Sequence, residues 1–436
     1  MMKRISLIFI TFVMLIAHSF AGGADFFDHR IFEIKLNVPV NVSNNTLSVA
    51  DFLQKEVIID LKELYEGMPK KGFDITVDAM PSAGFALDFK KGIHFGVEAG
   101  VDIFSKVGVS KDLFRFIAKG NELNEEITVS VNGYADVFAF TNLDIGFNLK
   151  RFNIRVQPAV FASIAHAVTT DSYVKASNGE DNSYNLVMNS NMDIYSSIPV
   201  TQELFGDTNL MVNQLINQLV PTMGFDMSGQ VSYKLTDFLK LTGSVRIPLA
   251  PSRLNYKTAF NYSSEYSVSV EKLMGKGDSE EGENGETTGE STPAAETPTT
   301  ESEPAATSLF SDPINEIYKI NRPMKFSISA NFTPFSWLMS YYGTLGIGIK
   351  HPGAKNRAET YAYVDYLIGT KLSLINIISL YLSTERTDEI YKHKATLALN
   401  FRLVEVDAGL AFESANLQTS FKGSGLGAFV TACIGF

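Results

Sequence analysis

Apolar and polar residues alternate with a period of two along most of the chain. In residues 32–42 the apolar side chains occupy every second position from Phe32 to Val42, and Glu33, Lys35, Asn37, Pro39 and Asn41 lie between them. The alternation returns in about seventeen segments, including residues 93–103, 127–131, 239–249, 395–403 and 404–412. Because successive side chains of a β-strand point to opposite faces, each segment predicts a strand with one apolar and one polar face.

These strands are too long for an ordinary soluble sheet. Many segments span about nine to thirteen residues, whereas soluble strands average roughly five or six. A strand that crosses a bilayer obliquely needs about nine to eleven residues. The pattern therefore predicts an all-β fold, a transmembrane antiparallel β-barrel of about 14 to 16 strands. The uncertain strands are those between Asn142 and Val200.

The connectors predict how the strands follow one another. Residues 90–92, 236–238, 250–252 and 369–371 read as tight turns between antiparallel neighbours, and residues 384–393 read as a long loop. Helical periodicity appears only in Ser48–Glu66, Asp112–Lys119 and Thr208–Leu219, which predict short helices covering a barrel mouth. The uncharged run Phe326–Ile349 has the length of a membrane helix, but Pro334 and its alternation favour two strands and a turn.

The first 21 residues have the form of a secretory signal peptide. Lys3 and Arg4 precede an apolar run, and Ser19 and Ala21 stand at the small-residue positions of a cleavage site. A membrane anchor is the alternative. We expect the mature chain, residues 22–436, to be a single barrel domain outside the cytoplasm.

Composition narrows the possible partners. The chain has 32 Phe and 17 Tyr beside one Trp, a mixture that favours strands, and its single cysteine, Cys433, excludes an intramolecular disulfide. The formal net charge is -11, and no basic face is apparent, so nucleic acid is not an expected partner. Residues 275–307 are acidic and lack aromatic and β-branched aliphatic side chains, which predicts a disordered loop on the exterior. This loop is a plain spacer, a surface that attracts cations or basic partners, or a variable surface antigen.

The last strand carries the most specific feature. Its outward face ends in Val430, Ala432, Ile434 and Phe436. This pattern resembles the C-terminal signal of bacterial outer-membrane β-barrel proteins. The resemblance implies a location in the cell outer membrane, with outer-membrane lipid and the barrel assembly machinery as partners. In size and helical inserts the chain is also similar to the FadL-type channels for fatty acids and hydrophobic compounds, and to uncharacterised spirochaete and Bacteroidetes barrel proteins.

Catalytic and metal-binding motifs are absent from the sequence pattern. The five histidines after the leader (His29, His94, His166, His351 and His393) include no pair at helical metal-ligand spacing, and no phosphate-binding loop occurs. Gly423-Ser424-Gly425 lacks the preceding glycine and the helix of a nucleophile turn. We therefore predict no enzyme activity, no cofactor and no metal.

The polar faces of the strands would line the lumen. They carry both signs of charge, at the candidate lumen-lining residues Glu33, Lys35, Glu98, Asp102, Arg155, Arg246, Lys394, Arg402, Glu405 and Asp407. The leading hypothesis is a channel for passive or facilitated passage of small, possibly hydrophobic, solutes. One alternative is a surface-exposed structural or adhesion protein anchored by a closed barrel. Another is a soluble all-β binding protein, in which the same charges would face solvent.

Overall fold

The computed structural model describes residues 31–47, 61–89, 92–119, 126–178, 183–201, 217–269, 309–335, 338–353, 360–375, 377–387, 389–401 and 403–436. Within these ranges the strands are β1 (Phe32–Asn44), β2 (Phe73–Ala79), β3 (Ser82–Phe89), β4 (Ile93–Val109), β5 (Glu126–Leu149), β6 (Phe152–Asn178), β7 (Ser183–Ser196), β8 (Gly224–Thr236), β9 (Leu239–Ala250), β10 (Ser252–Ser269), β11 (Ile314–Ile320), β12 (Met324–Phe335), β13 (Met339–Lys350), β14 (Tyr361–Ile375), β15 (Ile378–Thr387), β16 (Ile390–Asn400), β17 (Val404–Ser414) and β18 (Gly425–Gly435). The helices are α3 (Leu61–Gly67), α4 (Lys111–Lys119) and α7 (Leu417–Ser420), and residues 217–222 are also helical.

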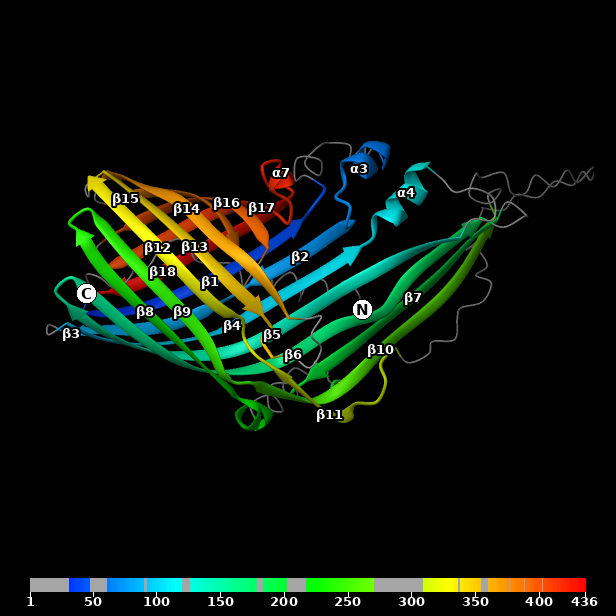
Figure 1. The fold of residues 1–436 in the computed structure, drawn as a ribbon, viewed down its shortest axis with the longest axis horizontal. Helices are drawn as coiled ribbons and strands as arrows, with labels where there is room; N and C mark the ends of the chain where they lie inside the picture. The colour runs from blue at the N-terminus through cyan, green and yellow to red at the C-terminus, as the bar shows by residue number, and fades with distance from the viewer. Residues whose placement is uncertain are drawn as a thin grey trace, which may run out of the picture.

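The strands close into a barrel (Figure 1). β1 pairs with β18 from Glu33↔Gly435 to Ser43↔Gly425, which joins the first and last strands. In four places two successive strands occupy one position of the wall: β2 with β3, β7 with β8, β9 with β10, and β11 with β12. Counted this way, the strands in the described residues form a closed antiparallel barrel of 14 positions, which confirms the predicted fold class.

The outward faces of the wall are apolar and exposed. Leu345 and Ile368 are 63% and 68% exposed, and Ile34, Leu36, Val42, Val231, Ile347, Leu382, Leu397 and Leu410 are also exposed large hydrophobics. Soluble monomers rarely expose an apolar patch of more than a few hundred Å². The alternation therefore places the apolar face outside and the polar face inside, as a barrel surrounded by lipid requires. Among the described helices, none has the length and hydropathy needed to cross a membrane.

The two ends of the barrel differ. Phe32 and Phe436 meet at one end, where the Phe32 N–H donates to the Phe436 carbonyl at 3.1 Å. The short turns between β3 and β4, β5 and β6, β8 and β9, and β12 and β13 lie at this short-turn end. The connectors that contain α3, α4 and α7 lie at the opposite end, which we call the loop end (Figure 1). At the loop end β6, β7 and β10 continue into a long extension.

Three predicted connectors were wrong. Ala250 to Ser252 is no hairpin, because β10 leaves β9 and pairs with β7 and β11 while β9 pairs with β8 and β12. Residues 369–371 lie inside β14, which continues to Ile375. Residues 384–393 form the end of β15, a short turn and the start of β16 rather than a long loop. The first error follows from non-local pairing, which local composition does not encode, whereas the other two misplace strand ends within the local hairpins β14–β15 and β15–β16.

The predicted helices are found in part. α4 matches Asp112–Lys119 closely, and α3 forms the end of the predicted Ser48–Glu66 helix. Residues 217–222 overlap the end of the Thr208–Leu219 prediction. The other parts of the two predicted segments lie outside the described residues, as do the leader 1–21 and the acidic segment 275–307. The run Phe326–Ile349 forms most of β12 and β13, so the prediction of two strands is confirmed.

Inward glycines beneath aromatic rings explain part of the unusual composition. Tyr363 lies opposite Gly348, and Phe429 lies opposite Gly409 on the neighbouring strand. A Cβ added at Gly409 would lie 2.3 Å from the Phe429 ring, so the ring covers the glycine. This aromatic cover over a strand glycine protects the backbone and fixes the register of the pair.

A charge on the outward face is expected to destabilise the barrel. Replacing Ile368 by Arg places a guanidinium in the lipid-facing belt, which costs about 2–4 kcal/mol near the middle of a bilayer. Urea unfolding of protein refolded in lipid vesicles measures this loss. The control is Leu417→Arg, which puts the same charge on the exposed helix α7 at the loop end. Equal stability of the two variants would contradict the lipid-facing assignment of β14.

Candidate functional site

The structure places nine of the ten candidate lumen residues on inward faces of the wall. They are Glu33, Lys35, Glu98, Asp102, Arg155, Arg246, Lys394, Glu405 and Asp407, whereas Arg402 lies outside the described residues. Glu33 and Asp407 are 1% and 3% exposed, so the lumen at these positions is filled by other side chains rather than open to bulk water. Whether these residues line a solute path stays a prediction.

Two of these charges, Lys394 and Arg155, form ion pairs with carboxylates on neighbouring strands. The register aligns Glu405, Cys433, Lys35, Gly84 and Glu98 in one row over five neighbouring strands. The small residues Cys433 and Gly84 therefore alternate with the charged residues of the row. They leave space in the lumen for the long charged side chains to approach one another. Elsewhere, Lys394 Nζ lies 2.6 Å from Glu385 Oε1, and Arg155 Nη1 lies 3.6 Å from Asp144 Oδ2. Pairing is what makes buried charges tolerable in a low-dielectric interior.

The residues expected to form the assembly signal lie on the outer face of β18. Ala432 and Val430 pair with Leu36 and Val38 of β1, and Ile434 and Phe436 are well exposed. This placement leaves the row accessible from the lipid side. Its recognition by the assembly machinery stays a prediction.

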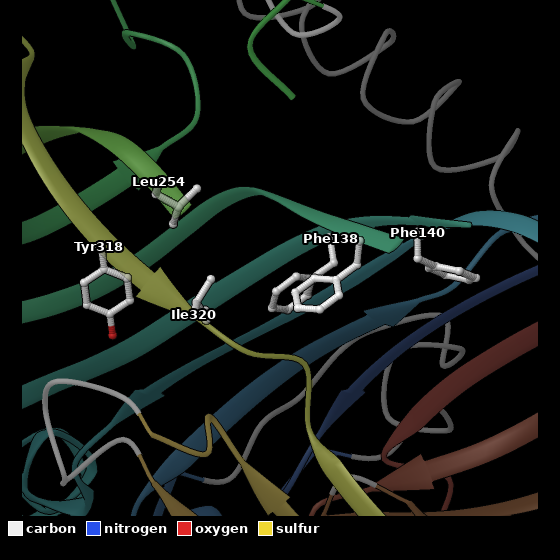
Figure 2. Packing of buried hydrophobic residues seen from close by; sticks show 6 residues of the cluster. Phe138, Phe140, Leu254, Tyr318 and Ile320 are labelled. Carbon is white, nitrogen blue, oxygen red and sulfur yellow. The ribbon is translucent and has the colours of Figure 1, made fainter. Parts of the chain in front are cut away.

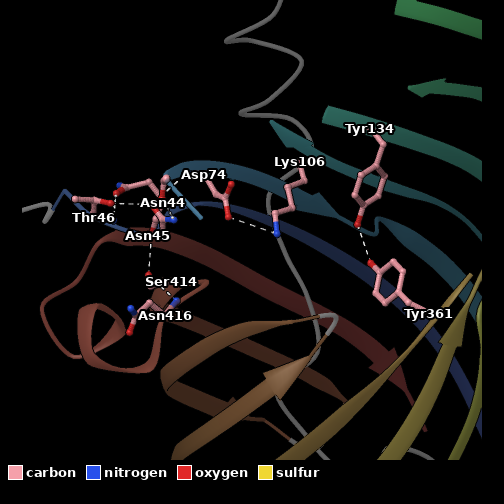
Figure 3. A network of polar contacts seen from close by, with 10 residues as sticks. Asn44, Asn45, Thr46, Asp74, Lys106, Tyr134, Tyr361, Ser414 and Asn416 are labelled. Carbon is pink, nitrogen blue, oxygen red and sulfur yellow. Dashed lines mark hydrogen bonds and ion pairs between the residues drawn. The ribbon is translucent and has the colours of Figure 1, made fainter. Parts of the chain in front are cut away.

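A pocket of about 570 Å³ lies inside the loop end of the barrel. Its walls come from the loop-end halves of β4, β5 and β6, from β2, and from the connector after β13. The side chains mix charged, hydroxyl and apolar groups: Lys71, Asp74, Lys106, Val109, Tyr134, His166, Val168, Thr169, His351, Tyr361 and Glu389. Figure 3 shows an ion pair between Lys106 and Asp74 and a hydrogen bond between Tyr134 and Tyr361. Lys106 Nζ lies 3.5 Å from Asp74 Oδ2, and Tyr134 Oη lies 3.1 Å from Tyr361 Oη.

Three buried groups form the floor of this loop-end pocket. Asp136 lies on β5, His166 on β6, and His351 directly after β13. Asp136 Oδ1 lies 2.7 Å from His166 Nδ1, and Asp136 Oδ2 lies 2.9 Å from His351 Nε2. The His351 contact joins the β5 side of the wall to the β13 side. All three side chains are nearly inaccessible to water, so their mutual contacts replace hydration.

An aromatic layer lies beyond this floor, toward the short-turn end. We define it by Phe138 and Phe140 of β5, Phe161 of β6, Leu254 of β10, and Tyr318 and Ile320 of β11 (Figure 2). The Phe138 and Phe161 rings meet edge to face with centroids 6.1 Å apart. Tyr318 also stacks on His166 at 4.9 Å, so the aromatic layer contacts the pocket floor directly.

A buried ion pair adjoins the aromatic layer. Arg322, between β11 and β12, has its guanidinium carbon 4.6 Å from the Phe140 ring centroid, and its Nη1 donates to Asp226 Oδ2 at 3.2 Å. The two side chains are 4% and 1% exposed. A guanidinium over an aromatic face and beside a carboxylate is favourable in such a dry place.

The lumen contains two further cavities beyond the aromatic layer. One of about 410 Å³ is bordered by Gln157, Arg246, Lys325 and Asp365, and one of about 390 Å³ lies among Asn148, Asn153, Asn331 and other residues at the short-turn end. Along β6 the order is Val168 and His166 in the loop-end pocket, Phe161 in the aromatic layer, then Gln157 and Asn153 in the two further cavities. Cavities therefore succeed one another along the barrel, with the aromatic layer between the first and the second.

Sequence reasoning missed the pocket floor and the aromatic layer. The one available signal was the alternation in residues 134–144, where Tyr134, Asp136, Phe138, Phe140 and Asp144 share a face. It indicates the inward positions of β5 but not their partners, because His166 and His351 are 30 and 215 residues from Asp136 in sequence.

The chain was compared with known proteins. A family model described as a family of unknown function, DUF5723, matches residues 31–246. No curated protein sequence gives a significant match. Solved structures with a similar chain path include the Ralstonia pickettii toluene transporter TbuX (6% identity, 94% of this chain and 90% of that chain, TM-score 0.43). Others are the P. putida toluene transporter TodX (9% identity, 96% and 95%, TM-score 0.44) and a Pseudomonas aeruginosa FadL homologue (10% identity, 94% and 91%, TM-score 0.44). At these identities the likeness concerns the fold.

Proposed function

We propose that the protein is an outer-membrane channel that admits small solutes to the barrel at its loop end and releases them at the short-turn end. The observation that carries this proposal is the series of cavities along the lumen, interrupted by the aromatic layer. A barrel that serves only as an anchor has no need of a pocket of about 570 Å³ at its mouth.

The aromatic layer is the gate in this proposal. Phe161 and Ile320 are each 1% exposed, so the layer is closely packed around them in this conformation. Apolar constrictions exclude water and ions until the side chains separate. A solute in the loop-end pocket lies on one side of the gate, and the polar cavity beside Arg246 and Lys325 lies on the other.

The pocket lining favours small solutes that combine an apolar body with a polar group. Val109, Val168 and the two tyrosine rings supply apolar area, while Lys106 supplies a hydrogen-bond donor. Sites for such ligands typically combine a mostly apolar wall with a few placed polar groups. We infer no enzyme activity for this arrangement.

The remaining assignments follow from the same proposal. Residues 1–21 act as a signal peptide, and residues 22–436 form one barrel domain with residues 275–307 as a loop within it. We assign the loop end to the outside, since membrane barrels carry their short turns on the periplasmic side. Outer-membrane lipid contacts the apolar belt, and the barrel assembly machinery recognises Val430, Ala432, Ile434 and Phe436.

Blocking the loop-end pocket is expected to stop solute uptake. Val168→Cys in a Cys433→Ser background puts a thiol on the pocket wall, and a bulky methanethiosulfonate reagent attached there occupies the entrance. Swelling of proteoliposomes in solutions of small sugars and aromatic acids measures uptake before and after labelling. Labelled Val168→Cys should lose most of its uptake.

The matched control carries the same label on the outside of the wall. Leu345→Cys lies on the exposed apolar face of β13, and its labelling should leave uptake unchanged. Uptake that survives complete labelling of Val168→Cys would contradict entry through the pocket. Wild-type vesicles that never swell would favour the surface-anchor alternative.

A further inference from the structure

We propose that Asp136, His166 and His351 bind one divalent transition-metal ion, with Zn²⁺ as the expected occupant, at the floor of the loop-end pocket. The three side chains each offer one ligand atom, and these atoms all lie within 4.8 Å of one another. This proposal does not depend on solute transport, because an ion can bind here whether or not the barrel conducts.

The positions of the ligand atoms suit a small ion. Asp136 directs one oxygen toward each imidazole, at 2.7 Å from His166 Nδ1 and 2.9 Å from His351 Nε2. Ligands around a tetrahedral zinc, with bonds of about 2.0–2.2 Å, stand about 3.3 Å apart. An ion inserted among these atoms requires the two Asp136 contacts to lengthen by about 0.4–0.6 Å and the wider pairs, which lie within 4.8 Å, to close toward the same spacing.

The three ligand groups favour transition-metal ions over Mg²⁺ and Ca²⁺. Two imidazoles and one carboxylate form a typical donor set for Zn²⁺ and related first-row ions, whereas Mg²⁺ and Ca²⁺ prefer oxygen ligands alone. His166 and His351 also border the loop-end pocket, so a water molecule or a solute can supply the fourth ligand from that side. The site thus has the three-ligand form with one open position.

Neighbouring groups hold the ligands in place. Tyr318 stacks on the His166 ring with an interplanar angle of 12°, and His351 meets His166 edge to face at 5.4 Å. The Lys350 ammonium is the adjacent positive charge, but it lies 3.6 Å from the Phe104 ring centroid and 3.4 Å from Tyr134 Oη. Its charge opposes metal binding without occupying the ligand atoms, so Lys350→Met should tighten binding.

Titration of the purified full chain tests the proposal. The protein is refolded in detergent without a polyhistidine tag and titrated with Zn²⁺ by calorimetry and with Co²⁺ by visible absorption. We expect one equivalent of metal and the strong visible bands of tetrahedral Co²⁺. His351→Ala and Asp136→Asn should each weaken binding by at least about 100-fold, since loss of even an outer-shell contact costs about 10–100-fold.

The matched control is another buried histidine that contacts carboxylates. His94 Nδ1 lies 3.0 Å from Asp88 Oδ1, and its Nε2 lies 3.6 Å from Asp144 Oδ2, but no second histidine joins it in the described residues. His94→Ala should retain the wild-type stoichiometry and affinity. His351 lies outside the strand ladder, and a heat-modifiable gel shift verifies that each variant has folded. Absence of binding by folded wild-type protein would overturn the proposal, as would equal affinities in wild type and His351→Ala.

Discussion

Replacing Phe140 and Phe161 together by alanine is expected to open the barrel. The two rings occupy inward positions of β5 and β6 between the loop-end pocket and the cavity beside Arg246, and Arg322 lies over both. Truncation removes the apolar side chains that keep the constriction dry, so water and ions can enter. In planar bilayers the variant should show at least roughly tenfold more open time than wild type.

The control removes rings of the same kind from the outside of the wall. Phe85 and Phe326 are 40% and 42% exposed on the lipid-facing side, and their double alanine variant should conduct like wild type. Each buried Phe→Ala change is also expected to cost about 3–5 kcal/mol, so folding of the variant is checked first by its gel shift. Unchanged conductance of a folded Phe140→Ala/Phe161→Ala barrel would exclude the aromatic layer as the gate.

Asp226→Asn is expected to give the largest loss of stability among polar substitutions. It removes the negative partner of Arg322, whose guanidinium then remains charged and buried. Breaking one side of a buried pair typically costs about 3–5 kcal/mol, because the remaining charge has lost both water and its partner. Urea unfolding in lipid vesicles measures this difference.

Two control variants distinguish the loss of the ion-pair partner from the effect of substituting a polar residue in itself. Asp226→Leu combined with Arg322→Met removes both charges and should cost much less than Asp226→Asn alone. Asp237→Asn removes the partner of Lys234 from an exposed ion pair at the short-turn end and should change stability little. If Asp226→Asn lowers the free energy of unfolding by no more than Asp237→Asn does, the buried Asp226–Arg322 ion pair does not stabilise the fold.

The strand faces were predictable from the sequence, but some strand neighbours were not. Ile34 and Leu36 are exposed to the outside while Glu33 and Asn37 are buried inside, as the period of two predicts. At Ala250–Ser252, in contrast, the sequence Ala-Pro-Ser is typical of a turn. The chain nevertheless continues from β9 into β10 without forming a hairpin. The partners of β10 are β7 and β11, whose residues lie far away in sequence.

In the candidate site, too, the sequence predicted individual residues but not which of them come together. The charges at Lys35, Glu98 and Glu405 were identified one by one, and the register of β1, β3, β4, β17 and β18 then placed them in one row. His166 and His351 looked isolated in the sequence, because metal-ligand spacing was sought within single elements. Their meeting at Asp136 depends on closure of the whole barrel.

The sequence by itself determined the class of fold, the outward and inward faces, and the polar character of the lumen. Side-chain alternation along one strand is a local property, and it follows directly from backbone geometry. Only the tertiary structure decided the 14 wall positions, the loop-end pocket, its Asp136–His166–His351 floor and the aromatic layer. These features depend on which strands pair and on contacts made across the lumen, and such long-range contacts leave no periodic signal in the chain.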